Sequence, residues 1–240
     1  MGSGIPQAPV EQGSTSSAFL DVFKVLFEPT AVFQRVAQRP RFLAPFVLIC
    51  VIQIAIYFVN MPFMKAGMAA QMASRPAGGP DPSKFLFIGA FFIPIGIGIA
   101  LLLGGLILWM LVSVFGGEGK FATLLSVASY AAVPSVILLA IVGTIVLHMQ
   151  GIGQIASPQD MQPALGLDLL APGAKGFTGA VLKSINPFGI WGLVLTAIGV
   201  STTHRLSKST GYTVATIGFL IGVLIAGAFA AMFAGRGGAG

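Results

Sequence analysis

Charge is what this 240-residue sequence has least of. Asp, Glu, Lys and Arg together make up 8% of it, against about 25% in a typical soluble domain. Hydrophobic residues make up 55%, and the mean hydropathy is +0.92. So few charges do not cover a water-facing surface, and the composition therefore predicts an integral membrane protein. The net charge of +6 comes from single, scattered basic residues, which suit topology determinants and contacts to anionic lipid rather than the basic patch of a nucleic-acid-binding protein.

Cysteine and histidine are nearly absent as well. Cys50 is the only cysteine, which excludes a disulfide within the chain, and its position inside an apolar run is typical of a small apolar filler. His148 and His204 follow different apolar runs and are expected on opposite membrane faces, so they cannot share a metal ion. The sequence predicts no metal site and no cofactor.

The apolar runs contain no acidic residue. All seven Asp and Glu residues fall in the N-terminal segment, in turns or in loops, whereas proton-coupled transporters generally place such groups at mid-membrane. Ser129 and Ser135 have no neighbouring base that would activate a hydroxyl. The segment 116–120 lacks the spacing of a phosphate-binding loop. We therefore predict that the protein is not an enzyme.

Two long apolar runs dominate what is present. Residues 85–115 and 121–147 contain no charged residue, and at ~1.5 Å per residue each exceeds the ~30 Å thickness of the hydrocarbon core. Between them Gly116, Gly117 and Gly119 allow the chain to reverse, and Glu118 and Lys120 keep the turn in water. This pattern predicts a transmembrane helical hairpin around which the other spans pack.

The whole pattern predicts an all-α, polytopic membrane bundle with five transmembrane helices. The expected spans are about 42–59, 88–115, 121–147, 187–203 and 214–234, within one membrane domain that covers residues 18–240. Residues 1–17 are rich in Gly, Ser, Pro and Gln, show no secretory signal, and are predicted to be a disordered cytoplasmic tail. Basic residues lie close to one set of span ends, which favours a cytoplasmic N-terminus and an extracytoplasmic C-terminus.

Residues 18–39 read as two short amphipathic helices. Phe19, Phe23 and Leu26 recur at helical spacing in the first, and Pro29 suits the first turn of the second. Val32, Phe33 and Val36 form one side of that second helix. We expect both helices to lie in the membrane surface with their apolar sides towards the lipid.

Proline and asparagine mark particular positions in the later spans. Pro94 predicts a tilt or kink, and Pro134 leaves the carbonyl of Tyr130 without its usual donor, so a kink is expected there too. Asn186 is suited to cap the helix that contains Trp191.

Small residues recur four apart in two spans. One stripe is Gly96, Ala100 and Gly104, and the other contains Gly218 and Gly222, followed by Ala226 and Ala230. Such stripes predict close approach between transmembrane helices. The motif and packing candidates are Pro29, Gly116, Gly117, Lys120, Tyr130, Pro134, Asn186, Trp191, Gly218 and Gly222.

Several of these features together resemble the bacterial Yip1 family. They are Pro29 and Phe33, the segment 115–121 with Tyr130 and Pro134, and the segment 186–191 with Gly199. The resemblance implies a five-helix membrane domain with a cytoplasmic N-terminus in the inner membrane of a bacterial cell. Eukaryotic members of the family act in vesicle traffic and bind Rab-type GTPases, but their Asp-Leu-Tyr-Gly-Pro motif is absent here, so that partner is not carried over.

Two functions remain open from the sequence. The first is a non-enzymatic membrane protein that binds other membrane proteins, itself or the lipid bilayer, as a trafficking-like scaffold or membrane organiser. The alternative is a transporter or channel for a small or neutral solute, with helices broken at Pro94 and Pro134 around a cavity. A cavity lined by Gln53, Ser129 and Tyr130 would favour the transporter, and a tightly packed bundle would favour the first function.

Overall fold

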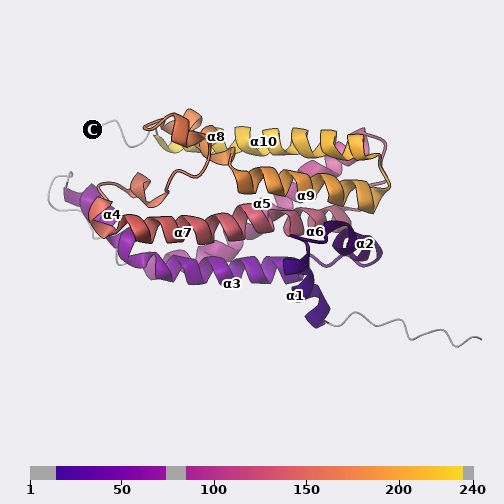
Figure 1. The fold of residues 1–240 in the computed structure, drawn as a ribbon, viewed down its shortest axis with the longest axis horizontal. Helices are drawn as coiled ribbons and strands as arrows, with labels where there is room; N and C mark the ends of the chain where they lie inside the picture. Colours follow the sequence, from indigo (N-terminus) through magenta and orange to yellow (C-terminus); the bar gives the residue numbers. More distant parts are fainter. Residues whose placement is uncertain (1–14, 74–84, 235–240) are drawn as a thin grey trace, which may run out of the picture.

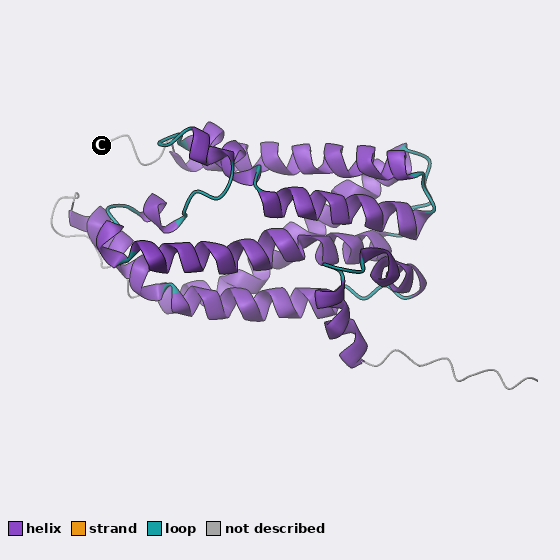
Figure 2. Ribbon diagram, in the orientation of Figure 1, coloured by secondary structure: helices purple, strands orange, loops and turns teal. Residues whose placement is uncertain are grey.

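The chain folds into long helices that lie side by side in one elongated bundle (Figure 1). The structure is a computed structural model and describes residues 15–73 and 85–234. All regular secondary structure in these two ranges is helical (Figure 2). The predicted all-α class is confirmed.

Three helices are long and apolar enough to cross a membrane. They are α5 (Leu86–Val114), α10 (Lys208–Ala234), and a continuous helix made of α6 (Phe121–Ala132), the π-helix η2 (Val133–Leu138) and α7 (Leu139–Gln150). Two bent pairs add up to two more spans. In the first, α3 (Leu43–Val59) meets α4 (Met61–Ala73) at 57°, and in the second α8 (Gly176–Ser184) meets α9 (Pro187–His204) at 61°. The described residues therefore form a polytopic helical bundle, as predicted, and the predicted five spans are reached if each bent pair is one span.

The two ends of the bundle differ in construction. The hairpin end carries the turn 115–120 between α5 and α6, the turn 205–207 between α9 and α10, and the N-terminal helices α1 (Thr15–Lys24) and α2 (Pro29–Gln38). The loop end carries α4, α8 and three short 3₁₀ helices: η3 (Ile152–Gln154), η4 (Pro158–Met161) and η5 (Leu167–Leu170). In Figure 1 the hairpin end lies on the right and the loop end on the left.

The prolines act differently in the two long helices. Pro94 lies inside α5, which continues past it as one helix. At Pro134 the chain instead changes to a π-helix, in which the Leu139 N–H reaches the Pro134 carbonyl. The Tyr130 carbonyl, which loses its donor at Pro134, accepts a hydrogen bond from the Val133 N–H. A π-helical segment therefore stands at Pro134, where a kink was predicted.

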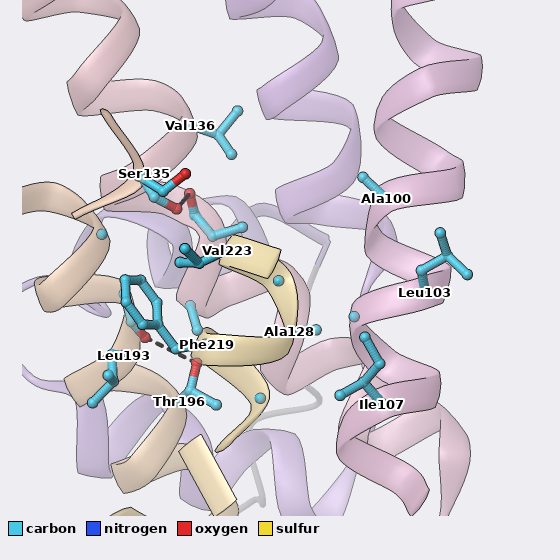
Figure 3. A pocket seen from close by; sticks show the side chains of 18 of the residues that line it. Ala100, Leu103, Ile107, Ala128, Ser135, Val136, Leu193, Thr196, Phe219 and Val223 are labelled. Carbon is cyan, nitrogen blue, oxygen red and sulfur yellow. Dashed lines mark hydrogen bonds between the residues drawn. The ribbon is translucent and has the colours of Figure 1, made fainter. Parts of the chain in front are cut away.

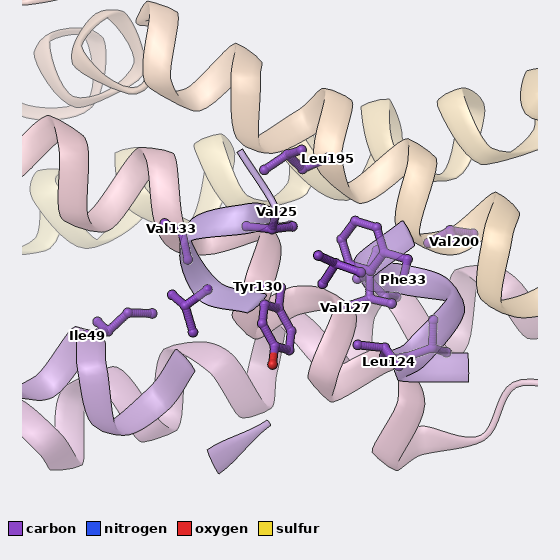
Figure 4. Packing of buried hydrophobic residues seen from close by; sticks show 14 of the residues in the cluster. Val25, Phe33, Ile49, Leu124, Val127, Tyr130, Val133, Leu195 and Val200 are labelled. Carbon is purple, nitrogen blue, oxygen red and sulfur yellow. The ribbon is translucent and has the colours of Figure 1, made fainter. Parts of the chain in front are cut away.

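The main hydrophobic core lies where α1 and α2 meet α6 and α9. Phe33 of α2 and Val25, in the turn between α1 and α2, pack with Val127 and Tyr130 of α6 and with Leu195 of α9 (Figure 4). All five side chains are at most 1% exposed. The N-terminal helices are therefore part of the bundle rather than attachments to it.

This arrangement corrects the prediction for α2, whose apolar side faces protein and not lipid. Val32 and Phe33 are fully buried in protein and Val36 nearly so. The reason is a complementary surface on α9, where the glycine at position 199 leaves room for the Phe33 ring. Of the residues predicted to face lipid, Phe23 is exposed, at 55%. Two neighbouring residues, Leu20 and Phe27, are also exposed, at 57% and 80%.

Candidate functional site

An apolar cavity of about 800 Å³ lies in the bundle. Its walls come from α5, from α6 with η2, from α9 and from α10. Figure 3 shows Ala100, Leu103 and Ile107 of α5 on one side, with Leu193 and Thr196 of α9 and Phe219 and Val223 of α10 on the other. The cavity lies beside the hydrophobic core and not within it.

The cavity exists because its walls are made of small residues. A Cβ atom added at Gly96 or Gly222 would meet nothing within 4 Å, and one added at Gly104 would meet only the Cβ of Ala128, at 3.9 Å. At Gly218 the nearest atoms are the ends of Leu108 and Leu111, at 3.6 Å. Within the chain, the close helix contact predicted for the two small stripes is therefore not made at Gly96, Gly104 and Gly222. These glycines line a hollow instead.

Close packing occurs at other glycines. A Cβ at Gly105 would lie 3.1 Å from the Leu125 Cα, one at Gly192 3.0 Å from the Ala131 carbonyl oxygen, and one at Gly199 2.6 Å from a Val127 methyl group. On α10 the tight glycines are Gly211, whose added Cβ would lie 2.7 Å from the Ala197 carbonyl oxygen, and Gly227, whose added Cβ would lie 2.7 Å from the Phe177 ring of α8. Spacing alone did not identify these positions, because it does not say which side of a helix meets protein.

The cavity opens towards the surroundings of the bundle between α5 and α10. Four of its large apolar lining residues are exposed there: Ile99 and Leu103 on α5 are 54% and 47% exposed, and Ile225 and Phe229 on α10 are 39% and 57% exposed. In a membrane this side faces lipid. The opening is therefore lateral, into the bilayer.

The polar groups of the cavity are few and most are already bonded. The Ser135 hydroxyl donates to the Ala132 carbonyl (3.2 Å) and the Thr196 hydroxyl to the Gly192 carbonyl (2.9 Å). At the loop end the cavity meets Lys183, Ser184 and Asn186. Asn186 caps α9, since its Oδ1 accepts from the Gly189 N–H at 2.9 Å. The cap predicted at Asn186 thus also forms the polar edge of the cavity.

The three polar residues that would have favoured a solute pathway lie elsewhere. Gln53 Nε2 donates to the Val136 carbonyl (2.7 Å), and the Ser129 hydroxyl donates to the Leu125 carbonyl (2.8 Å). The Tyr130 hydroxyl donates to the Ala18 carbonyl of α1 (3.2 Å). Each side chain has a structural partner, and none of them lines the cavity.

The remaining candidate residues from the sequence lie at helix starts, in turns or in the packing of the bundle. Pro29 occupies the first turn of α2, and Lys120 precedes α6 as its N-cap residue. Gly116 has a φ of +81°, and a Cβ at Gly117 would lie 2.6 Å from Val112. Trp191 packs, half-buried, on the hydrophobic core. Tyr130 and Pro134 belong to the span that forms one cavity wall, and Gly218 and Gly222 line the cavity itself.

A second polar feature joins the N-terminal helices. Arg35 donates from Nε to one oxygen of Asp21 (3.1 Å) and from Nη2 to the other (2.6 Å), and the Asp21 side chain is 8% exposed. This hydrogen-bonded carboxylate raises the pKa of Arg35, because it favours the charged guanidinium. The pair fixes α1 to α2 while their apolar sides fill the core.

Groups that could hold a metal ion do not gather in the described ranges: no cluster of three or more His, Cys, Asp or Glu side chains occurs there. His148 ends α7 at the loop end, where it packs on Phe63 with ring centroids 4.6 Å apart. His204 ends α9 at the hairpin end. The two histidines therefore lie at opposite ends of the bundle.

Comparison with known proteins gives the family. The family model of the Yip1 domain matches residues 23–231. The chain belongs to the Yip1 domain family. A relative of this Yip1 domain is the membrane protein YknW of Bacillus subtilis (strain 168), which is 27% identical over 228 residues, covering 90% of this chain and 92% of the relative. No solved structure matches the chain.

Proposed function

We propose that this Yip1 domain protein is a non-enzymatic membrane organiser that holds a membrane-embedded partner, protein or lipid, in the cavity between α5 and α10. The observation that carries the proposal is the lateral opening of that cavity, whose exposed rim consists of Ile99, Leu103, Ile225 and Phe229. A hollow with apolar walls that opens into lipid suits a ligand that is already dissolved in the bilayer.

The transporter alternative receives less support. A pathway for a small polar solute needs polar groups that face the hollow, yet Gln53, Ser129 and Tyr130 bond to backbone carbonyls elsewhere. The cavity walls offer hydroxyl groups whose protons are already donated within their own helices. The hollow is therefore better suited to binding than to solute passage.

The proposed location is the cytoplasmic membrane of a bacterial cell, with the hairpin end in the cytoplasm. The bacterial relative supports the cell type. The distribution of basic residues supports the orientation. Lys24, Arg35, Arg39, Arg41, Lys120, Arg205 and Lys208 lie in or next to the segments of the hairpin end, against Lys65, Lys175 and Lys183 among the described residues of the loop end.

Site-specific photo-crosslinking in native membranes tests the proposal. A photoreactive residue at Leu103 lines the cavity, whereas one at the neighbouring Leu102, equally exposed at 49%, does not. We expect a discrete, saturable adduct from position 103 that is lost when Gly222→Leu fills the cavity. Position 102 should give only diffuse lipid labelling. Identical adducts from both positions, unaffected by Gly222→Leu, would show that the cavity holds nothing specific.

A further inference from the structure

The described residues that line the cavity are mostly apolar, and a charge stands at one end. Lys183, in the last turn of α8, is the one charged residue among these described lining residues. Its ammonium group makes two long bonds, to the carbonyl and to the side-chain oxygen of Gln162 at 3.5 and 3.3 Å. Both partners are neutral, so the positive charge of Lys183 is not compensated by either of them. An anion at this end of the cavity would meet an available cation.

The length of the cavity matches one leaflet of a bilayer. On α5 its lining residues run from Gly96, on the side of Lys183, to Leu108, which is ~18 Å of helix at 1.5 Å per residue. Half of a ~30 Å hydrocarbon core is ~15 Å. A chain that enters beside Lys183 and follows α5 therefore reaches about as deep as the chains of that leaflet.

The volume of the cavity, about 800 Å³ along ~18 Å of helix, accommodates one extended hydrocarbon chain.

We infer that the cavity binds one acyl chain of an anionic phospholipid from the leaflet at the loop end, with the lipid phosphate against Lys183. This inference rests on the proposed function, for which it names the ligand. The chain lies along Gly96, Ala100 and Gly104 of α5 and Gly218 and Gly222 of α10, where the missing side chains leave room. The remaining parts of the lipid stay in the bilayer beyond Leu103 and Phe229.

Photoreactive lipids in vesicles test this inference with the full-length purified protein. The probes are phosphatidylglycerol and phosphatidylcholine, each with a diazirine near the end of one acyl chain, in phosphatidylcholine vesicles. We expect the phosphatidylglycerol probe to label residues near Leu108 about fivefold more than the phosphatidylcholine probe, in line with ~1 kcal/mol per Lys at an anionic surface. Equal labelling by both probes overturns the preference for an anionic headgroup, because both lipids carry a phosphate.

Four variants provide the controls. Lys183→Gln should reduce phosphatidylglycerol labelling to the phosphatidylcholine level, while Lys175→Gln, at the other end of α8 and outside the cavity, should leave it unchanged. Gly222→Leu should abolish deep labelling by both probes, while Ala226→Leu, exposed on the same helix but not lining the cavity, should not. If Lys175→Gln reduces labelling as much as Lys183→Gln, the site at Lys183 is wrong.

The two experiments distinguish failure of the lipid inference from failure of the proposed function. If no lipid labels the cavity but Leu103 still captures a discrete protein in native membranes, the lipid inference falls and the proposed function stands. If neither lipid nor protein is captured from the cavity, both fall.

Discussion

Asp21 and Arg35 show how a single pair of side chains holds the N-terminal helices together. The carboxylate is nearly buried, whereas the guanidinium is about half exposed. Removing one partner therefore has different consequences. Loss of the arginine leaves a buried charge unpaired, whereas loss of the carboxylate charge leaves an arginine that can turn to water.

We therefore predict that Arg35→Gln loosens α1 more than Asp21→Asn does. Limited trypsin digestion of the protein in detergent, followed at the Lys24 site, measures the opening of α1. Arg39→Gln serves as the control, because Arg39 is exposed and lies one helical turn beyond Arg35, just past the end of α2. Faster cleavage of Asp21→Asn than of Arg35→Gln would contradict the argument from burial.

Leucine substitutions at Gly199 and Gly222 distinguish a tightly packed position from one that lines the cavity. Gly199→Leu should strongly lower the thermal stability of the protein in detergent, because its side chain would meet Val127 and Phe33 at 2.6–3.0 Å, and overpacking typically costs ~1–3 kcal/mol or more. Gly222→Leu should leave stability nearly unchanged, since its added Cβ meets nothing within 4 Å. A larger loss for Gly222→Leu would restore the small-residue stripe as a helix contact.

Local backbone features could be predicted from single residues of the sequence, but contacts between helices that are distant in the chain could not. The Asn186 cap, the positive φ of Gly116 and the irregularity at Pro134 all follow from what those residue types do to the adjacent backbone. The stripe at Gly218 and Gly222 has the same local signature as a helix contact, but its role depends on what stands opposite. That information lies in α5 and α9, far away in the chain.

At the scale of elements, α1 and α2 show the same limit. The amphipathic pattern identifies an apolar side in Val32, Phe33 and Val36, but it does not distinguish lipid from protein as its cover. The deciding partner is α9, more than a hundred residues later, whose Gly199 receives Phe33. The lipid prediction failed because both environments demand the same residue types.

Phe33 and Phe27 offer a matched test of this arrangement. Phe33 is fully buried and Phe27 is 80% exposed. Phe33→Ala should cost roughly 3–5 kcal/mol, as for other buried phenylalanines, and should open α2 to trypsin at Arg35. Phe27→Ala should change cleavage little in detergent. Equal protease resistance of the two variants would mean that the docking of α2 does not depend on the core.

At the scale of the whole molecule, the bent pairs decide the topology. If each pair forms one span, the bundle has five spans and the two ends of the chain lie on opposite sides of the membrane. We predict that a green fluorescent protein fused into the turn at Glu118 is fluorescent in the cytoplasm, and that alkaline phosphatase fused after Gly240 is active outside. The reverse pair of results would overturn the orientation, and two cytoplasmic results would overturn the span count.

The docking of α2 on α9 has a consequence for synthesis. The ribosome completes α2 at Gln38, but the helix that covers Phe33 begins only at Pro187. At ~5–20 residues per second, the interval lasts on the order of ten seconds. During this interval α2 is complete but lacks α9, which covers its apolar side in the folded protein. The apolar side of α2 must then bind the bilayer surface or a chaperone until the last spans have been synthesised.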